Sequence, residues 1–493
     1  MSPYQFAALI LVVIGPVLAV ARASNIPPSL LLFGVGLAST ALPGLPQLRI
    51  DPQLVLNLFL PPLIYASAVR LSRHLLRFVF VPGILIGALT VLATVGIVAV
   101  SARFVILPGL SWTAGLLLGV VVSVFDTRIF QEAKGAPHVP RAIADTLKAR
   151  ELVARLVILA TFALVLEGAS SDRLPVMALL EHYALDLPAG ILVGLLIGAG
   201  MGLLRQRIDT APVEIAVSVA TPYAAALAAV AFGVSAVGAV TAAALVISAV
   251  RIDTRTGAPI SSSETRISAV AFWEQASLMV SSALFLLAGR ALPEALVTIE
   301  TWSPWRLGLA TVALLSLVLL VQAVFSYVST WAQPVAEACG QSSRRRAAAA
   351  AVMTWSSTRS VIGLVIALAV PTSLTDGATF PERDLILVVA ALAIVGSVLL
   401  QGFTLRAVVD KAGLGGEQEQ TREESEARSA MEAAYASPDQ RHANGFDAAR
   451  QALLQLRKQN RIGDEVMVGM LRETDLKSRA VEEGAAPAGP TKP

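Results

Sequence analysis

The chain has little of what disulfide-rich proteins, metalloproteins and soluble enzymes depend on. Its 493 residues include one cysteine, Cys339, and four histidines, which exclude an internal disulfide and argue against a cysteine/histidine metal cluster. Charged residues make up 15% of the chain, below the roughly one quarter that is typical of soluble proteins. The net charge of +3 is too small to indicate a nucleic-acid surface, and no nucleic-acid partner is expected. No phosphate-binding loop and no Ser-His-Asp arrangement stands out, so neither an enzyme nor a cofactor is expected.

Apolar residues, in contrast, make up 55% of the chain and form long runs. A helix needs roughly 20 apolar residues to cross the hydrocarbon core of a bilayer. Thirteen windows approach this length and predict an all-α membrane protein with about 13 transmembrane helices. They cover residues 4–21, 28–43, 53–69, 78–101, 111–132, 143–168, 187–204, 213–230, 232–250, 270–289, 305–329, 347–370 and 385–409. Only Phe232 and Gly233 mark the boundary between the eighth and ninth windows.

The first window and the loop charges set the expected topology. No lysine or arginine precedes Tyr4–Ala21, so the window is interpreted as a membrane helix and not as a secretory signal. Cations gather in the loops after odd-numbered windows, whereas those after even-numbered windows hold isolated cations, as in Asp172-Arg173. Cytoplasmic loops carry the excess of lysine and arginine, so we expect the N-terminus outside and the C-terminus in the cytoplasm.

The composition changes at Gly415, which divides the chain into a transmembrane domain, residues 1–414, and a cytosolic tail, residues 415–493. Glu417–Arg428 is interpreted as a charge-rich, solvated stretch. Phe446–Asn460 and Asp464–Arg479 predict two short amphipathic helices, and Glu483–Pro493 is expected to be disordered. Two interpretations of the tail remain open: a solvated cap on the last helix, or a regulatory or dimer-linked module.

Several segments, in order along almost the whole chain, resemble the monovalent cation/proton antiporter family of NhaP and NHE type. Each match alone is weak, and their order carries the resemblance. The matching segments are Ile50–Tyr65, Leu118–Asp126, Pro222–Ser235, Ser263–Arg266, Phe272–Glu274, Ser281–Gly289, Trp355–Arg359, Phe380–Asp384 and Leu400–Leu405. The end of the tail, from Leu453 through Val466, is similar to the cytosolic extension of bacterial members.

This resemblance implies two inverted six-helix repeats, a dimerisation and a core subdomain, and two broken helices that cross near the bilayer midplane. It also implies exchange of Na⁺, Li⁺ or K⁺ for protons by alternating access, in a homodimer of a bacterial-type inner membrane. Irregular backbone is tolerated inside a bilayer where it lines a cavity, and coupling ions bind near the midplane.

The expected ion site departs from the family pattern. The Thr-Asp-Pro of the fifth helix becomes Phe125, Asp126 and Thr127, so that only the carboxylate remains. The Asn-Asp that ends the motif of the sixth helix becomes Ala154-Arg155, or the next pair along if the register shifts by one residue. The arginine expected late in the eleventh helix is Gln322, whereas the arginine of the twelfth is kept as Arg359. Candidate ion-binding or transport residues are therefore Asp126, Ser123, Thr127, Glu151, Arg155, Ser357 and Arg359.

Arg155 changes the electrostatics of such a site. A guanidinium stays charged and offers donors only, whereas a cation needs oxygen ligands. Two unit charges 4 Å apart interact by about 4 kcal/mol at an effective dielectric constant of 20. Repulsion of that size lowers Na⁺ affinity by roughly three decades. Arg155 has two expected partners, Asp126 and Glu151, and the full set of charge-pair candidates is Asp126, Arg155, Glu151 and Arg150.

Three functions remain open from the sequence. The first is cation/proton exchange through Asp126. The second is a carrier altered toward an anion, with Arg155, Arg359 and Arg150 around its cavity. The third is a non-transporting relative, a pseudo-antiporter that acts as a sensor or scaffold and is held by an Asp126–Arg155 pair.

Overall fold

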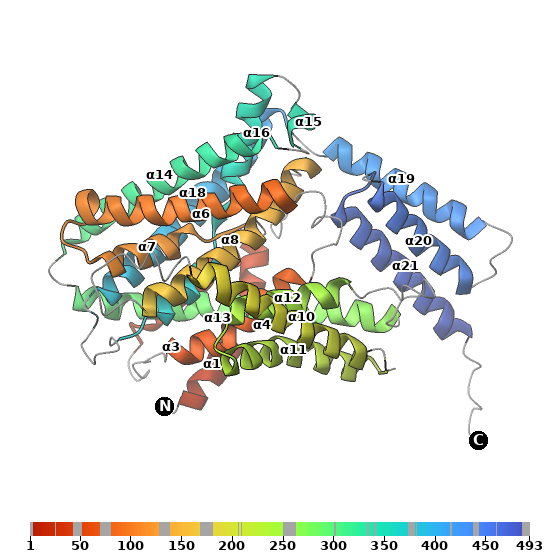
Figure 1. Cartoon of the computed structure of the whole chain (residues 1–493), viewed down its shortest axis with the longest axis horizontal. Helices are drawn as coiled ribbons and strands as arrows, with labels where there is room; N and C mark the ends of the chain where they lie inside the picture. Colours follow the sequence, from red (N-terminus) through yellow and green to blue (C-terminus); the bar gives the residue numbers. More distant parts are fainter. Residues whose placement is uncertain are drawn as a thin grey trace.

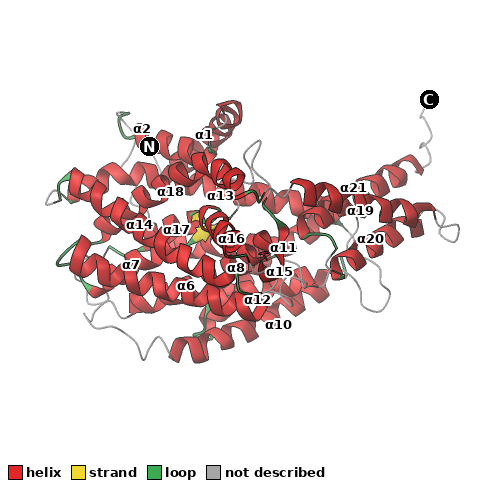
Figure 2. Ribbon diagram, turned by 90° about the horizontal axis from the view of Figure 1, so that it is seen from above, coloured by secondary structure: helices red, strands yellow, loops and turns green. Residues whose placement is uncertain are grey.

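The computed structural model describes residues 3–24, 26–42, 52–69, 80–127, 139–167, 181–205, 207–208, 210–249, 263–299, 302–332, 335–339, 342–372, 380, 382–414, 417–436, 443–459 and 461–485. Apart from one pair of very short strands, the regular elements of these residues are helical (Figures 1 and 2). The fold class predicted from the hydropathy pattern is confirmed.

Helical elements follow one another along the transmembrane part of the chain. In its first half they are α1 (Pro3–Ser24), α2 (Pro28–Ser39), α3 (Pro52–Leu54), η1 (Val55–Phe59), α4 (Leu60–Ala68), α6 (Phe80–Ser101), η2 (Ala102–Ile106), α7 (Trp112–Ser123), α8 (Arg141–Glu167), η4 (His182–Asp186) and α10 (Leu187–Arg205). In its second half they are α11 (Ala211–Ala231), α12 (Ala236–Ala249), α13 (Ser263–Thr298), α14 (Pro304–Ser329), α15 (Val335–Cys339), α16 (Ser343–Trp355), α17 (Val361–Ala369) and α18 (Arg383–Ala412). The short strands β1 (Phe125–Asp126) and β2 (Thr358–Arg359) interrupt two of the predicted windows.

Each of the thirteen windows contains helix. Six helices among the described residues are long and apolar enough to cross a membrane, and shorter apolar helices accompany them. The uncertain boundary at Phe232 and Gly233 is also found, since α11 ends at Ala231 and Gly233 has a φ of +65°, which glycine adopts without strain. The window 111–132 was predicted as one helix, but α7 ends at Ser123 and gives way to β1, while 128–132 lies outside the described residues.

The transmembrane helices form two groups that lie in the lower and upper halves of the view in Figure 1. The scaffold group comprises α1, α2, α4, α10, α11, α12 and α13. The crossing group comprises α6, α7, α8, α14, α16, α17 and α18. Helix α13 packs against α17 and α18, and α12 packs against α8, so these contacts join the two groups.

Glycines at four-residue spacing allow the closest packing in the scaffold group. On α10, Gly190, Gly194 and Gly198 face α12, where a Cβ atom on Gly194 would overlap the carbonyl of Ala239. Small residues on one helix face let two membrane helices approach backbone to backbone. The close contact between α10 and α12 therefore depends on glycine at these positions, because any side chain there would overlap the facing helix.

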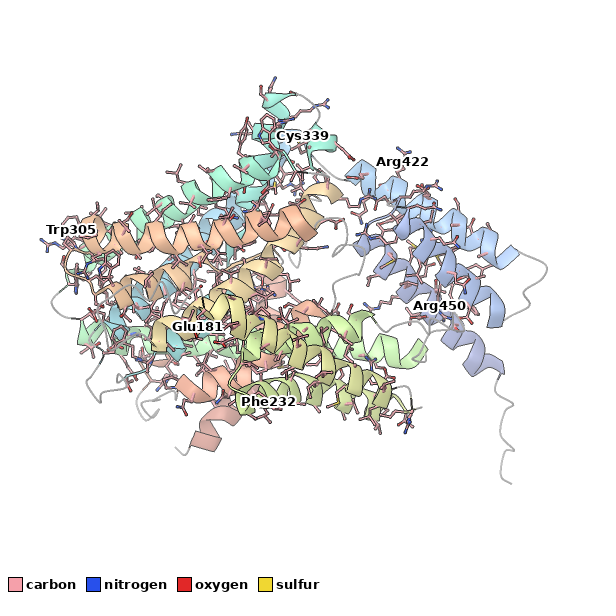
Figure 3. The ribbon with its side chains drawn as sticks, in the orientation of Figure 1. Glu181, Phe232, Trp305, Cys339, Arg422 and Arg450 are labelled. Carbon is pink, nitrogen blue, oxygen red and sulfur yellow. The ribbon has the colours of Figure 1, made fainter. Side chains whose placement is uncertain are left out.

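The tail differs from the expectation in its first part. Glu417–Arg428, expected to be a solvated stretch, belongs to helix α19 (Glu417–Ala436), because Ala427, Ala430 and Met431 form an apolar stripe at helical spacing. The stripe packs against α20 (Ala443–Lys458) and α21 (Asp464–Ala485), and we call α19, α20 and α21 together the tail unit (Figure 3). Residues 483–485, expected to be disordered, belong to α21, and 486–493 lie outside the described residues.

Candidate functional site

Two helix breaks meet inside the crossing group. Strand β1 pairs antiparallel with β2, so that Phe125 lies opposite Arg359 and Asp126 opposite Thr358. The hydroxyl of Thr358 also donates to the backbone oxygen of Asp126 at 2.9 Å. Figure 2 shows the two strands among the surrounding helices. The pairing places the Asp126 carboxylate beside α8, which brings the fifth and sixth predicted helices to one site.

Arg359 donates hydrogen bonds to carbonyl groups that the breaks leave without helical partners. Its Nη1 donates to the carbonyl oxygens of Val122 at 2.9 Å and Ser123 at 3.3 Å, and its Nη2 donates to that of Ser357 at 2.9 Å. The side chain is 1% exposed. Backbone carbonyls freed inside a membrane need such donors, because no water is there to replace them.

Two residues of α18, which the sequence reading did not single out, support the second break. The hydroxyl oxygen of Ser397 accepts from the backbone N–H of Arg359 at 3.1 Å, and its hydrogen is donated to Gln401. The amide nitrogen of Gln401 donates to the carbonyls of Thr354 and Ser357 at 3.0 and 3.3 Å. Polar residues in the apolar run of α18 were the available signal, since a buried glutamine in a membrane helix needs partners.

The charged centre of the site is a triad of Asp126, Glu151 and Arg155. Nη2 of Arg155 lies 3.2 Å from Oδ2 of Asp126 and also donates to Oε1 of Glu151, one turn earlier on α8. The backbone N–H and the hydroxyl of Thr127 donate to Oε2 of Glu151 at 3.2 and 2.7 Å. The three charged residues are each at most 6% exposed. One guanidinium therefore connects the Glu151 carboxylate of α8 with the Asp126 carboxylate of β1.

The remaining candidates lie apart from the triad. The hydroxyls of Ser123 and Ser357 donate back to their own helices, to the carbonyls of Val120 and Met353 at 2.8 Å each. Their own carbonyls accept from the guanidinium described above.

Arg150 does not join the charge pairs, contrary to the expectation. It is fully buried between α6 and α14, where its guanidinium donates to the hydroxyls of Thr90 and Ser326 at 3.3 Å each. Among the described residues no carboxylate forms a salt bridge with it. Residues 150 and 151 point about 100° apart on a helix, so the face that turns Glu151 toward Asp126 turns Arg150 away. Gln322, which occupies the position where the family resemblance implies an arginine, lies one turn before Ser326 on the same face of α14 and is also buried.

The balance of charge limits what the site can bind. Two carboxylates and one guanidinium leave the triad with one net negative charge. Removal of the guanidinium would leave two negative charges with carboxylate and threonine oxygens, which are ligands suited to a small cation. Within the part of the chain that the structure describes, no cluster of three or more His, Cys, Asp and Glu could hold a metal ion.

Comparisons with known proteins agree with this architecture. The family model described as "Sodium/hydrogen exchanger, transmembrane" matches residues 8–411. The uncharacterized Na(+)/H(+) exchanger Rv2287 of Mycobacterium tuberculosis (strain ATCC 25618 / H37Rv) is 30% identical over 405 residues, which are 81% of this chain and 72% of that protein. The Na(+)/H(+) antiporter ApNhaP of Aphanothece halophytica is 26% identical over 431 residues, covering 83% and 74% of the two chains.

Among solved structures, the sodium proton antiporter MjNhaP1 from Methanocaldococcus jannaschii at pH 8 superposes with a TM-score of 0.63. The superposition covers 83% of this chain and 98% of that one, at 16% sequence identity. It therefore supports the shared fold of the helices and the crossing. The chain belongs to the sodium/hydrogen exchanger family of membrane transporters.

Proposed function

We propose that this protein is a secondary carrier that exchanges a monovalent cation for protons, and that Arg155 competes with the cation for Asp126 and Glu151. The observation that carries the proposal is the contact of one guanidinium with both carboxylates. By resemblance Arg155 stands at, or next to, the position where relatives hold the last acid of the sixth-helix motif. The side chain would then act as a tethered cation that occupies the site when no ion is bound.

Electrostatics determine how such a site would work. A cation and the Arg155 guanidinium at about 4 Å repel each other by about 4 kcal/mol at an effective dielectric constant of 20. Binding of the cation therefore requires the Arg155 guanidinium to move away from the carboxylates. If a carboxylate takes up a proton while the guanidinium is away, that proton must leave before the cation binds. We infer that Asp126 is the group for which protons and cations compete.

Assembly and orientation complete the proposal. We place the N-terminus outside and the C-terminus in the cytoplasm of a bacterial-type inner membrane, on the basis of the cations in the loops after odd-numbered windows. Many of those cations, including Arg70 and Arg251, lie outside the described residues. A homodimer is proposed from the resemblance alone.

A second candidate is a non-transporting scaffold of the same fold. It is favoured by the closed hydrogen bonding of the triad, in which Arg155 and Thr127 together contact both carboxylates. The anion carrier is disfavoured, because Arg155 is committed to carboxylates and Arg359 to carbonyls. Among the described residues Arg150 and Arg359 both form no salt bridge, and Arg150 donates only to two hydroxyls.

Proteoliposomes with an internal pH indicator distinguish the two candidates. We expect addition of Na⁺, Li⁺ or K⁺ to move protons in vesicles with the wild-type chain at some pH between 6 and 9, and Asp126→Asn to abolish the response. Correctly folded wild-type protein without any cation-dependent proton movement over that range would reject exchange and favour the scaffold. A response that persists unchanged in Asp126→Asn would reject the site.

A further inference from the structure

The tail unit is a separate small bundle with its own apolar core. That core consists of buried residues from all three helices and from the turn between α20 and α21, among them Ala427, Met431, Leu453, Ile462 and Met470. Its first helix follows α18 closely, since α18 ends at Ala412, the next residue Gly413 has a left-handed conformation (φ +63°), and α19 begins at Glu417. The tail unit is therefore held near the end of the crossing group by a short connection.

Two ion pairs of opposite polarity join the tail unit to the first turns of α8. Arg141 of α8 pairs with Glu423 of α19 at 2.6 Å, and Asp145 of α8 pairs with Arg457 of α20 at 3.3 Å. Arg457 and Asp145 are 2% and 7% exposed. Each side of the contact supplies one acid and one base, so the pattern selects one way of docking, and breaking a buried pair leaves a charge without its partner.

The turn between α20 and α21 completes this contact. The backbone N–H of Gly463 donates to Oε2 of Glu423 at 2.6 Å, and Nη1 of Arg457 donates to the carbonyl of Ile462 at 3.3 Å. A Cβ atom at Gly463 would lie 3.1 Å from both the Arg141 side chain and the Glu423 carboxylate. The turn is therefore packed tightly against the same ion pair that holds α8.

The third helix of the tail unit contacts the other group of transmembrane helices. Helix α21 packs against α13, a member of the scaffold group (Figure 1). One rigid bundle thus contacts α8 of the crossing group and α13 of the scaffold group. Asp145 lies six residues before Glu151 on α8, or about 9 Å along the helix axis.

We propose that the tail unit is a strap that fixes α8 of the crossing group relative to α13 of the scaffold group, and that the two groups move apart only after the Arg141–Glu423 and Asp145–Arg457 pairs separate. The proposal rests on the proposed function only in assuming that the groups move during transport. Its effect on their relative position can be measured without any transport assay. The tail unit docks on the first turns of α8 in the same chain.

The test uses full-length protein in lipid nanodiscs and a charge-swap cycle. Arg141→Glu and Glu423→Arg each place like charges together, whereas the double variant restores an opposite pair. Amide hydrogen exchange at residue 141 reports docking, because the backbone N–H of Arg141 on α8 donates to Oε2 of Glu419 on α19 at 3.2 Å across the contact. After correction for the intrinsic rate of each sequence, we expect each single variant to exchange at least about tenfold faster at residue 141 than wild type, and the double variant to return most of the protection.

The position of the two groups is read from spin labels in the same variants. Cys339→Ala removes the native thiol, and Arg207→Cys after α10 and Arg344→Cys on α16 place one label in each group. We expect one narrow distance in wild type, a second population in both single variants, and recovery of the narrow distance in the double variant. The control variant is Arg428→Glu, which places a like charge beside Glu473 in a more exposed ion pair within the tail unit. It should change neither the amide exchange nor the label distance.

Two results would overturn the strap. The first is slow exchange at residue 141 in both single variants, which would mean that the ion pairs do not hold the tail unit. The second is fast exchange at residue 141 with an unchanged label distance, which would mean that docking does not fix the groups. A chain that moves no protons but shows the expected distances would reject the proposed exchange function and leave the strap supported.

Discussion

Arg155 binds one carboxylate of its own helix and one of the extended segment β1, with its Nη2 3.2 Å from Oδ2 of Asp126 and in direct contact with Glu151. A charge pair within one helix would stabilise that helix alone. This contact instead ties α8 to the extended segment that follows α7. The position of the α8 face relative to the helix break therefore depends on one guanidinium.

Replacement of Arg155 by glutamine should create a site that responds to cations. Asp126 and Glu151 would face each other without the intervening positive charge, and a bound cation would relieve their repulsion. A cation at ten times its dissociation constant adds about 1.4 kcal/mol of stability. We expect the thermal unfolding temperature of Arg155→Gln to rise with NaCl, compared with choline chloride, more than that of wild type. An equal salt response in Arg155→Gln and in the exposed control Arg344→Gln would contradict the competition.

Replacement of Arg359 by lysine should loosen the crossing. An ammonium cannot reach the carbonyls of Val122, Ser123 and Ser357 from one position, whereas the planar guanidinium contacts all three. Loss of one or two charged hydrogen bonds costs about 3 kcal/mol. The check is the unfolding temperature in detergent or nanodiscs, with Arg344→Lys on the exposed start of α16 as the matched control. Equal unfolding temperatures for the two variants would show that Arg359 is not needed to hold the breaks.

Two glycines on α10 should respond oppositely to alanine. Gly194 faces the backbone of Ala239, so its added methyl group must push α10 and α12 apart, at a cost of about 1–3 kcal/mol. Gly200 on the same helix has no atom within 4 Å of an added Cβ, and alanine there should be neutral or stabilise by up to about 1 kcal/mol. Unfolding temperatures of the two single variants provide the comparison. A loss of stability in Gly200→Ala as large as that in Gly194→Ala would refute the close contact.

The stability of the folded tail unit should depend on pH through Glu423. Burial raises the pKa of this carboxyl above its ordinary value of 4.5, against the lowering effects of the Gly463 N–H and Arg141, while Glu419 and Asp145 raise it further. A raised pKa in the folded state means that the folded form binds the proton more tightly than the unfolded form. The contribution of Glu423 to the free energy of unfolding is therefore fully present below 4.5, is lost as pH rises through the raised pKa, and is constant above it.

Amide hydrogen exchange at Gly463, corrected for the intrinsic effect of pH, measures this dependence. Glu423→Gln keeps a hydrogen-bonding side chain without the titration, so its protection should not change over the same pH range. Protection that increases with pH in wild type would contradict the assigned direction.

Sequence patterns anticipated the membrane fold and part of the site. The runs of apolar residues located the helices. The retained Asp126, Glu151 and Arg359, together with the replacement Arg155, identified the region where the breaks meet. The partners of the arginines were harder to predict from the sequence. Arg150 and Arg155 are five residues apart and equally charged, yet one is held by two hydroxyls and the other by two carboxylates.

Other parts could not be predicted because their partners are distant in the chain. Ser397 and Gln401 lie in an apolar run that resembles an ordinary membrane helix. Their hydrogen-bond partners belong to the segment Thr354–Arg359, which only the tertiary structure places beside them. Helix α19 was interpreted as solvated because its composition is charged. Its apolar stripe is narrow and becomes evident only when α20 and α21 cover it.

The amino-acid sequence by itself determined that this chain crosses a membrane as helices and where its charged tail begins, because hydropathy and length are properties of short segments. Only the tertiary structure decided that Arg155 faces both acids, that Arg359 holds the two breaks together, and that the tail unit reaches from α8 to α13. Those contacts depend on the rotation and position of helices that lie far apart in the chain, which packing sets and local sequence does not encode.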